Sequence, residues 1–155
     1  AILAGDERTG VCLMEVTEGL DEGGVFARAE TDVDAKTLDE LRDELVDLGN
    51  GLLLDALRDG FGTPEPQVGE PVYAHKLTAD DRRIDWTGQA EGVLRVVRLG
   101  GAWTTFRGKR VRVLGATIDA DGRAVPTEVQ PECKGPMAFD AWRNGAQPAP
   151  DEWFE

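Results

Sequence analysis

The stretch GFGTPEPQVGEP, residues 60–71, decides how this chain is divided. It holds three glycines and three prolines within twelve residues. Proline removes a backbone donor and glycine adds conformational freedom, so such a stretch cannot continue a helix or a central strand. We therefore predict a linker over residues 61–72. It would separate one domain, or part of one, over residues 1–60 from a second over residues 73–155.

Before this stretch, two runs typical of strands precede a long helical pattern. The runs are VCLMEV and GVFARA, residues 11–16 and 24–29, in which β-branched and aromatic side chains favour a strand. Thr37 and Glu40 have the spacing of a capping box, which predicts that a helix starts there and ends at Gly60. Its apolar face would consist of Leu38, Leu41, Leu45, Leu48, Leu52 and Ala56. The order strand, loop, strand, helix is typical of the end of an α/β domain.

Beyond the stretch, the pattern changes to one short helix and several small strands. Valines at helical spacing predict a helix over residues 89–99, and two short strands flank Gly108 as a hairpin. Residues 125–130 predict a last strand, and residues 137–145 a closing helix. This arrangement indicates a small β-barrel of the OB type.

The charge of the chain is distributed unevenly. The net charge is −13, yet residues 82–112 hold eight basic residues and only two acidic ones. Arg110 and Arg112 alternate with Val111 and Val113, so both arginines would share one face of a strand. A local basic face can attract a phosphate backbone even in an acidic protein, and ordinary solvated charge is the alternative.

Four motifs, in collinear order, resemble a known family. They are GDERTGVCLMEVTEGLDEGG near the start, YAHKLTADDRRIDW after the linker, GGAWTTFRGKRVRVL in the hairpin and VQPECKGPM towards the end. Together they resemble the bacterial methionyl-tRNA formyltransferases over nearly the whole chain. The YAHKL and RIDW elements are the more specific ones, because the first motif is shared with other enzymes that use 10-formyltetrahydrofolate.

The resemblance implies an α/β protein, in which the C-terminal part of a Rossmann-like formyltransferase domain precedes a small OB-like β-barrel. The implied reaction transfers a formyl group from the co-substrate 10-formyltetrahydrofolate to the α-amino group of methionyl initiator tRNA. The implied protein is cytoplasmic and monomeric at full length, with no metal and no membrane partner. The family's Asn and His, two residues apart, and its SLLPxxRG stretch would lie upstream of residue 1. We therefore expect this chain to be a catalytically incomplete fragment.

The resemblance also assigns site residues. Asp21, in GLDEG, matches the catalytic aspartate of the family, although an aspartate among glycines is by itself typical of a turn. The segment implied to line the folate pocket consists of Thr17, Glu18, Gly19 and Leu20. The candidates for tRNA phosphate contacts are Arg107, Lys109, Arg110 and Arg112.

Three departures from the family pattern leave two alternatives open. Glu22 stands where the family usually has Thr, Cys133 stands where it has Gly, and only the short segment 116–126 joins strands between which the family has more. The first alternative is a folate-dependent formyltransferase that acts on a nucleotide sugar. The second is a non-catalytic RNA-binding remnant.

For several other residues we expect a structural role and not a catalytic one. We expect Cys12 to lie in the core, Trp86 to anchor the second domain, and Phe106 to lie in its core. Trp103 is either a core residue or a ring on which a nucleotide stacks. His75, the only histidine, lies where the family motif leaves the residue type open, so we do not expect it to be catalytic.

Overall fold

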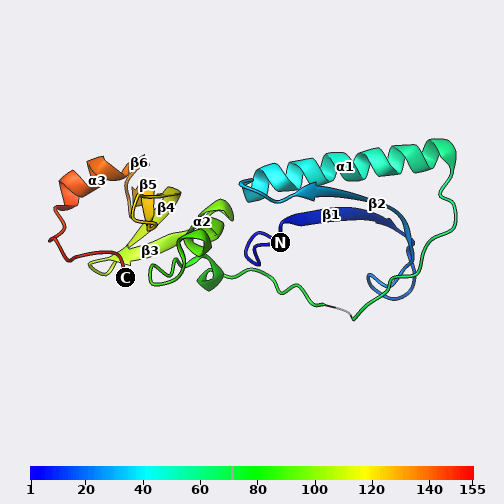
Figure 1. Cartoon of the computed structure of the whole chain (residues 1–155), viewed down its shortest axis with the longest axis horizontal. Helices are drawn as coiled ribbons and strands as arrows, with labels where there is room; N and C mark the ends of the chain where they lie inside the picture. Colours follow the sequence, from blue (N-terminus) through cyan, green and yellow to red (C-terminus); the bar gives the residue numbers. More distant parts are fainter. Residues whose placement is uncertain (71) are drawn as a thin grey trace. The chain divides into compact units, whose positions relative to one another are not determined.

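The structure is a computed structural model that describes residues 1–70 and 72–155 (Figure 1). Its contacts divide the chain into two units. The first unit comprises Ala1 and residues 6–75, and the second comprises residues 2–5 and 76–155. Pro71, which belongs to the predicted linker, lies outside the described residues. None of the helices in the described parts of the chain is long and apolar enough to cross a bilayer.

The first unit is an antiparallel hairpin against which one long helix packs. Its elements are β1 (Arg8–Met14), β2 (Val25–Asp32) and α1 (Leu38–Asp59). Both predicted strands are confirmed with shifted ends, because strand pairing starts where Arg8 faces Asp32. At the other end of the hairpin, the Glu15 N–H donates to the Gly24 carbonyl over 2.8 Å and closes the loop between the strands.

Helix α1 begins and ends where the sequence predicts. The Thr37 hydroxyl accepts a hydrogen bond from the Glu40 N–H over 3.3 Å, and the Thr37 N–H donates to the Glu40 carboxylate over 2.8 Å. The bond from the Thr37 N–H also lowers the pKa of Glu40. The helix ends at Gly60, whose φ of 97° suits glycine and whose N–H donates to the Ala56 carbonyl. Gly51 does not interrupt the helix.

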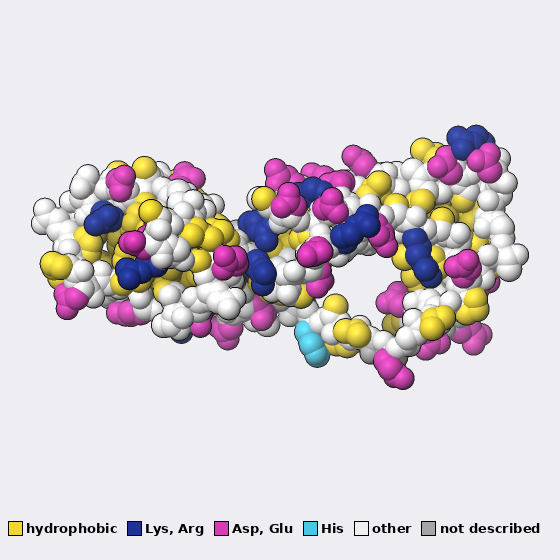
Figure 2. Space-filling model, in the orientation of Figure 1, with side chains coloured by type: hydrophobic (Ala, Val, Ile, Leu, Met, Phe, Trp, Pro, Cys, Tyr) yellow, Lys and Arg dark blue, Asp and Glu magenta, His cyan; other side chains and the backbone are white. Residues whose placement is uncertain are grey.

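The first turns of α1 are tied to the hairpin by a polar cluster. The Thr31 hydroxyl on β2 donates to the Glu44 carboxylate, and the Lys36 ammonium lies 2.7 Å from the same carboxylate. These partners, Lys36 first, lower the pKa of Glu44. Val33 is buried next to them at 1% exposure. On the outer side, acidic side chains gather over the N-terminal half of α1 (Figure 2).

Cys12 corrects one expectation, since its side chain is exposed and not part of the core. The reason is the two-residue period of a strand. Val11 faces α1, where its methyl group would lie 3.4 Å from a Cβ added at Gly49. Its neighbour Cys12 therefore points to the opposite face of the hairpin, which α1 does not cover.

The second unit is a four-stranded antiparallel sheet with two short helices. Its elements are a 3-10 helix η1 (Asp80–Arg82), α2 (Ala90–Arg98), β3 (Trp103–Phe106), β4 (Lys109–Ile118), β5 (Ala124–Pro131), β6 (Met137–Ala138) and α3 (Phe139–Ala146). The sheet order is β3-β4-β5-β6, so in the described residues β3 and β6 are edges and no closed barrel forms. The predicted OB-like barrel is therefore not confirmed. Met137 starts a short strand, not the closing helix.

The β3–β4 hairpin has the two-residue loop that the sequence indicates. Arg107 and Gly108 both have positive φ, 48° and 70°, as in a type I′ turn. This turn matches the right-handed twist of paired strands, which explains why Phe106 and Lys109 face each other directly.

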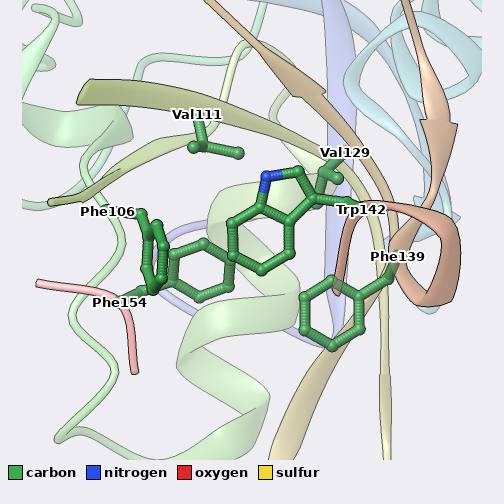
Figure 3. Close-up of a cluster of buried hydrophobic side chains, with 6 residues drawn as sticks. All are labelled: Phe106, Val111, Val129, Phe139, Trp142 and Phe154. Atoms are coloured by element: carbon green, nitrogen blue, oxygen red, sulfur yellow. The ribbon is translucent and has the colours of Figure 1, made fainter. Parts of the chain in front are cut away.

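Two hydrophobic clusters hold the second unit together. The larger one joins β3, β4, β5, α3 and the C-terminal tail (Figure 3), and its buried members are Phe106, Val111, Val129, Phe139, Trp142 and Phe154. The smaller one lies under α2 and contains Ile84, Val93, Ala102 and Val113. Trp86 packs against both clusters, and its ring N–H donates to the buried Thr104 hydroxyl over 2.9 Å. The predictions that Trp86 anchors this unit and that Phe106 lies in its core are confirmed.

A strained position follows β5. Cys133 has φ of 60°, in the left-handed region that favours glycine. It is the third residue of a four-residue turn, 131–134. In this turn the Lys134 N–H donates to the Pro131 carbonyl over 3.1 Å. Turns with positive φ at this position require glycine or asparagine, so Cys133 keeps its conformation at a cost in free energy.

We predict that Cys133→Gly raises the free energy of unfolding by about 1 kcal/mol, because it removes the left-handed strain of a Cβ and keeps the turn. Urea denaturation of both proteins measures the difference. The matched control is Cys133→Ala, which removes the thiol and retains the Cβ, and should leave stability within about 0.5 kcal/mol. Equal stabilisation by both variants would contradict the prediction, because the effect would then come from the sulfur.

Candidate functional site

The predicted catalytic residue, Asp21, lies exposed in the loop between β1 and β2. Its φ is 59°, a left-handed conformation that aspartate tolerates better than most residues. The neighbouring Gly23 allows a close approach of the backbone, since a Cβ there would lie 1.9 Å from the Glu15 carbonyl oxygen. The loop thus makes a sharp return that depends on this glycine, and Asp21 lies within it.

The stretch interpreted as a linker contacts this loop. Val25 and Glu65 exchange two backbone hydrogen bonds, of 2.7 Å and 2.9 Å. The side-chain amide of Gln67 donates to the Asp21 carbonyl and to the Gly23 carbonyl, each over 2.8 Å. Residues 65–67 therefore form part of the structure around Asp21.

The predicted folate-lining segment, residues 17–20, forms the exposed approach to Asp21. The Thr17 hydroxyl donates to the Gly19 carbonyl over 3.2 Å. Leu20 is 93% exposed and Val16, just before the segment, is 96% exposed. The Glu22 carboxylate fills the space beside Gly19, because its oxygen would lie 2.1 Å from a Cβ there. The loop thus presents apolar side chains and backbone groups to solvent.

This loop presents the Asp21 carboxylate to solvent. Its tip carries a carboxylate on a short side chain, held by a fixed backbone. In residues 1–70 and 72–155, no group of three or more His, Cys, Asp or Glu side chains has the arrangement of a metal site.

The predicted nucleic-acid face lies on the sheet of the second unit. Arg110 and Arg112 are exposed, and Val111 and Val113 between them are buried at 3% and 1% exposure, so the predicted alternation is confirmed. Cross-strand pairing places Trp103 opposite Arg112. We call the outward residues Trp103, Arg110, Arg112 and Gln130 the basic face; Gln130 pairs with Arg112 from β5.

Trp103 is half-buried in this face and held by arginines. The Arg110 guanidinium lies 4.2 Å from the centre of its ring, and the Arg83 guanidinium 5.5 Å from it. The ring N–H donates to the Ala79 carbonyl over 2.8 Å. These contacts fix the ring and hold two positive charges beside it.

The other two predicted tRNA contacts lie in different surroundings. Lys109 faces Phe106 across the hairpin and so starts on the side of the sheet opposite to Arg110. Arg107 forms two hydrogen bonds of 2.6 Å with the Glu152 carboxylate and one of 3.2 Å with the Ala146 carbonyl. Arg107 thus fastens the C-terminal tail to the hairpin turn.

This ion pair changes the titration of its acid. The Arg107 guanidinium and, next, the Ala149 N–H lower the pKa of Glu152 from its usual value of 4.5 to about 2. Glu152 in turn raises the pKa of Arg107. The guanidinium is therefore shared with an internal carboxylate and is less available to phosphate than those of Arg110 and Arg112.

A hollow of about 410 Å³ lies elsewhere in the second unit. Trp86, Val93, Arg123 and Trp153 line it, together with parts of the loop between β4 and β5. None of the residues predicted to contact tRNA lines this hollow.

Comparison with known proteins identifies relatives of this chain. Residues 76–124 match the family described as formyl transferase, C-terminal domain. The methionyl-tRNA formyltransferase of Ruegeria pomeroyi is 41% identical over 136 residues, which cover 83% of this chain and 45% of that protein. The protein of the same name from Jannaschia sp. is 38% identical and covers the whole of this chain and 60% of its own length. This chain is homologous to the methionyl-tRNA formyltransferases.

The chain spans about half the length of the curated formyltransferases it matches. Solved structures share its fold. The methionyl-tRNA formyltransferase from Clostridium thermocellum has a TM-score of 0.69 at 18% identity, over 86% of this chain and 60% of that one. HypX from Aquifex aeolicus, in a complex with tetrahydrofolic acid, has a TM-score of 0.66 at 22% identity, over 92% of this chain and 31% of that one. At these identities the likeness shows the fold alone.

Reasoning from the sequence missed two residues of this formyltransferase relative. Gln67 lies between prolines in a stretch interpreted as a linker, and its partners are 44 and 46 residues away. Glu152 lies in a tail without periodicity, 45 residues from Arg107. Neither contact has a local signal, because periodicity reports only neighbours along one element.

The Glu152–Arg107 pair predicts a pH dependence of stability. Because the folded state lowers the pKa of Glu152, the pair contributes fully above pH 4.5 and its contribution disappears as pH falls towards 2. We expect Glu152→Gln to be less stable than the wild type at pH 6 and to lose less stability between pH 5 and pH 3 in thermal melts. Glu132→Gln, at an exposed glutamate in the turn after β5, is the control and should follow the wild type. A Glu152→Gln variant with the acid response of the wild type would contradict the assignment.

Proposed function

We propose that the protein containing these residues transfers a formyl group from 10-formyltetrahydrofolate to the α-amino group of methionyl initiator tRNA. The observation that carries the proposal is the GLDEG loop, with Asp21 exposed in a fixed bend, in a chain about 40% identical to proteins named methionyl-tRNA formyltransferase. Such an enzyme acts in translation initiation, in the cytoplasm. We also propose that the open sheet of the second unit is a shortened OB-like barrel.

The Asp21 loop supports the chemical part of this proposal. Formyl transfer requires a proton to leave the attacking amine and to reach the departing nitrogen. A carboxylate on a short, fixed side chain can orient a neighbouring imidazole and hold a water molecule for this transfer. Asp21 meets these requirements because its side chain is exposed and its backbone is held through its carbonyl. We assign the imidazole to the histidine that the family resemblance implies, and not to His75.

The segment of residues 17–20 supports binding of the folate. Leu20 offers apolar surface at 93% exposure, and a bound ring would have to displace the Glu22 carboxylate from the space beside Gly19. When bound, 10-formyltetrahydrofolate supplies the formyl group that the amine receives. Thr17, Glu18, Gly19 and Leu20 would line one side of the ring and orient it towards Asp21.

The basic face supports binding of tRNA. Arg110 and Arg112 are exposed on one side of the sheet, and Trp103 is fixed between strand and guanidinium groups. Contacts of this kind attract the phosphate backbone and position it without reading the base sequence. Arg107 and Lys109 would contribute less, because Arg107 is paired with Glu152 and Lys109 starts on the opposite side.

A sugar N-formyltransferase is the second candidate. WlaRD, described as a sugar 3N-formyl transferase, shares the fold with a TM-score of 0.56 at 12% identity. The basic face favours tRNA over a nucleotide sugar, because a face of exposed arginines suits a long run of phosphates better than one diphosphate. An RNA-binding remnant would keep this face and show no turnover.

We predict that Asp21→Asn lowers kcat for formyl transfer at least about 100-fold, because the carboxylate that assists proton transfer is lost. The assay measures formylation of methionyl-tRNA, and of an amino sugar nucleotide, by the gene product that contains residues 1–155. Asparagine tolerates the left-handed conformation of residue 21, so the thermal midpoint should stay unchanged.

The control for this assay is Asp121→Asn, the same change on an exposed turn of the second unit. Its rate should equal that of the wild type. Turnover of the sugar nucleotide alone would favour the second candidate, and RNA binding without any turnover would favour the remnant. An active Asp21→Asn variant would remove Asp21 from the catalytic residues.

We predict that the double variant Arg110→Gln, Arg112→Gln binds initiator tRNA more weakly and with a smaller salt dependence. Each lost phosphate contact lowers the slope of log K against log salt by about 1, so the double variant should lose about 2. Fluorescence anisotropy at several salt concentrations measures both quantities. Arg58→Gln, on the acidic helix α1, should leave the slope unchanged. An unaltered slope in the double variant would exclude the basic face as the tRNA contact.

A further inference from the structure

A single side chain from the linker stretch holds the loop that carries Asp21. The Gln67 amide nitrogen lies 2.8 Å from the Asp21 carbonyl oxygen and 2.8 Å from the Gly23 carbonyl oxygen. A primary amide nitrogen carries two N–H groups, and here each has one acceptor. Both donors of Gln67 are therefore used on the loop.

The two acceptors belong to the peptide group that joins Asp21 to Glu22 and to the one that joins Gly23 to Gly24. A peptide group is planar, so a bond to the Asp21 carbonyl fixes the plane that joins residues 21 and 22. The torsion ψ of Asp21 describes how this plane is rotated about the bond from the Asp21 Cα to its carbonyl carbon. Together with φ, it determines the direction in which the side chain leaves the loop. With φ of Asp21 at 59°, the carbonyl bond to Gln67 fixes the remaining freedom of that residue's backbone.

Gln67 can act in this way because the chain next to it is anchored. Val25, at the start of β2, exchanges hydrogen bonds of 2.7 Å and 2.9 Å with Glu65. Pro64 packs against the loop end, since a Cβ at Gly24 would lie 2.8 Å from the Pro64 Cβ. The amide of Gln67 therefore reaches the loop from a segment bonded to the strand that follows it.

We propose that Gln67 is a positioning residue for formyl transfer, which holds the Asp21 carboxylate in its reactive direction through the loop backbone. This inference rests on the proposed function, and it adds a residue from the linker stretch to the active site. Gln67 touches no reacting atom. Its effect should therefore fall on kcat and not on the binding of either substrate.

The test compares Gln67→Glu with the wild type in two measurements. Glutamate has the same shape but no N–H, and at pH 7 its charge repels both carbonyl oxygens. We expect hydrogen exchange of the Glu15 and Val25 amides, which are hydrogen-bonded at the two ends of the loop, to be about tenfold faster, since the two hydrogen bonds of Gln67 are lost. We expect kcat for formylation to fall about 10-fold to 100-fold, as for a misplaced catalytic group, with both KM values within about twofold.

Two further variants separate positioning from general stability. Gln67→Lys keeps N–H donors of similar reach, so it should restore slow exchange and most of kcat. Gln89→Glu makes the same chemical change at an exposed position whose side chain does not cap α2, and should leave exchange of the Glu15 and Val25 amides and kcat unchanged.

The outcomes distinguish this inference from the proposed function. Absence of turnover by the wild type on either acceptor overturns the proposed function and the catalytic role of Gln67 with it. Turnover by the wild type with an unchanged kcat in Gln67→Glu overturns the positioning role alone. Unchanged exchange in Gln67→Glu overturns the loop contact itself. Faster exchange with a lower kcat, an unchanged KM and rescue by lysine supports the inference.

Discussion

The return of the backbone at Gly23 is the constraint on which the first unit depends. A Cβ at this position would lie 1.9 Å from the Glu15 carbonyl oxygen, so the two ends of the loop approach each other only because the side chain is absent. This approach lets Glu15 bond to Gly24 and sets the start of β2. The linker stretch then bonds to that start through Glu65. The conformation around Asp21 thus follows from one backbone contact.

In the second unit, the alternation of β4 separates a buried apolar face from an exposed basic one. Val111 and Val113 point inwards and join the two hydrophobic clusters, whereas Arg110 and Arg112 point outwards. The same four residues therefore stabilise the sheet and provide its charge. Because the valines fix the register, the spacing of the arginines on the surface is fixed as well. No further helix or strand is therefore needed to position these two arginines.

The two units carry surface charge of opposite sign, acidic on helix α1 and basic on the sheet. Helix α1 carries acidic side chains over its N-terminal half, and these would repel a phosphate backbone. The basic face of the sheet would attract it. A negative net charge of the whole chain therefore does not exclude RNA binding. It would restrict such binding to the basic face. The pairing of Arg107 with Glu152 narrows that surface further, because this guanidinium is already bonded to the tail.

Local patterns in the sequence determined where several helices, strands and turns of this protein lie. The capping box of Thr37 and Glu40, the two-residue turn at Gly108 and the alternation in β4 are set by neighbouring residues, so the sequence alone was enough to predict them. The tertiary structure decided the rest, such as the exposure of Cys12 and the open sheet in place of a barrel. It also brought Gln67 to Asp21, across 46 residues. Such contacts depend on the packing of distant segments, and a periodic pattern carries no information about them.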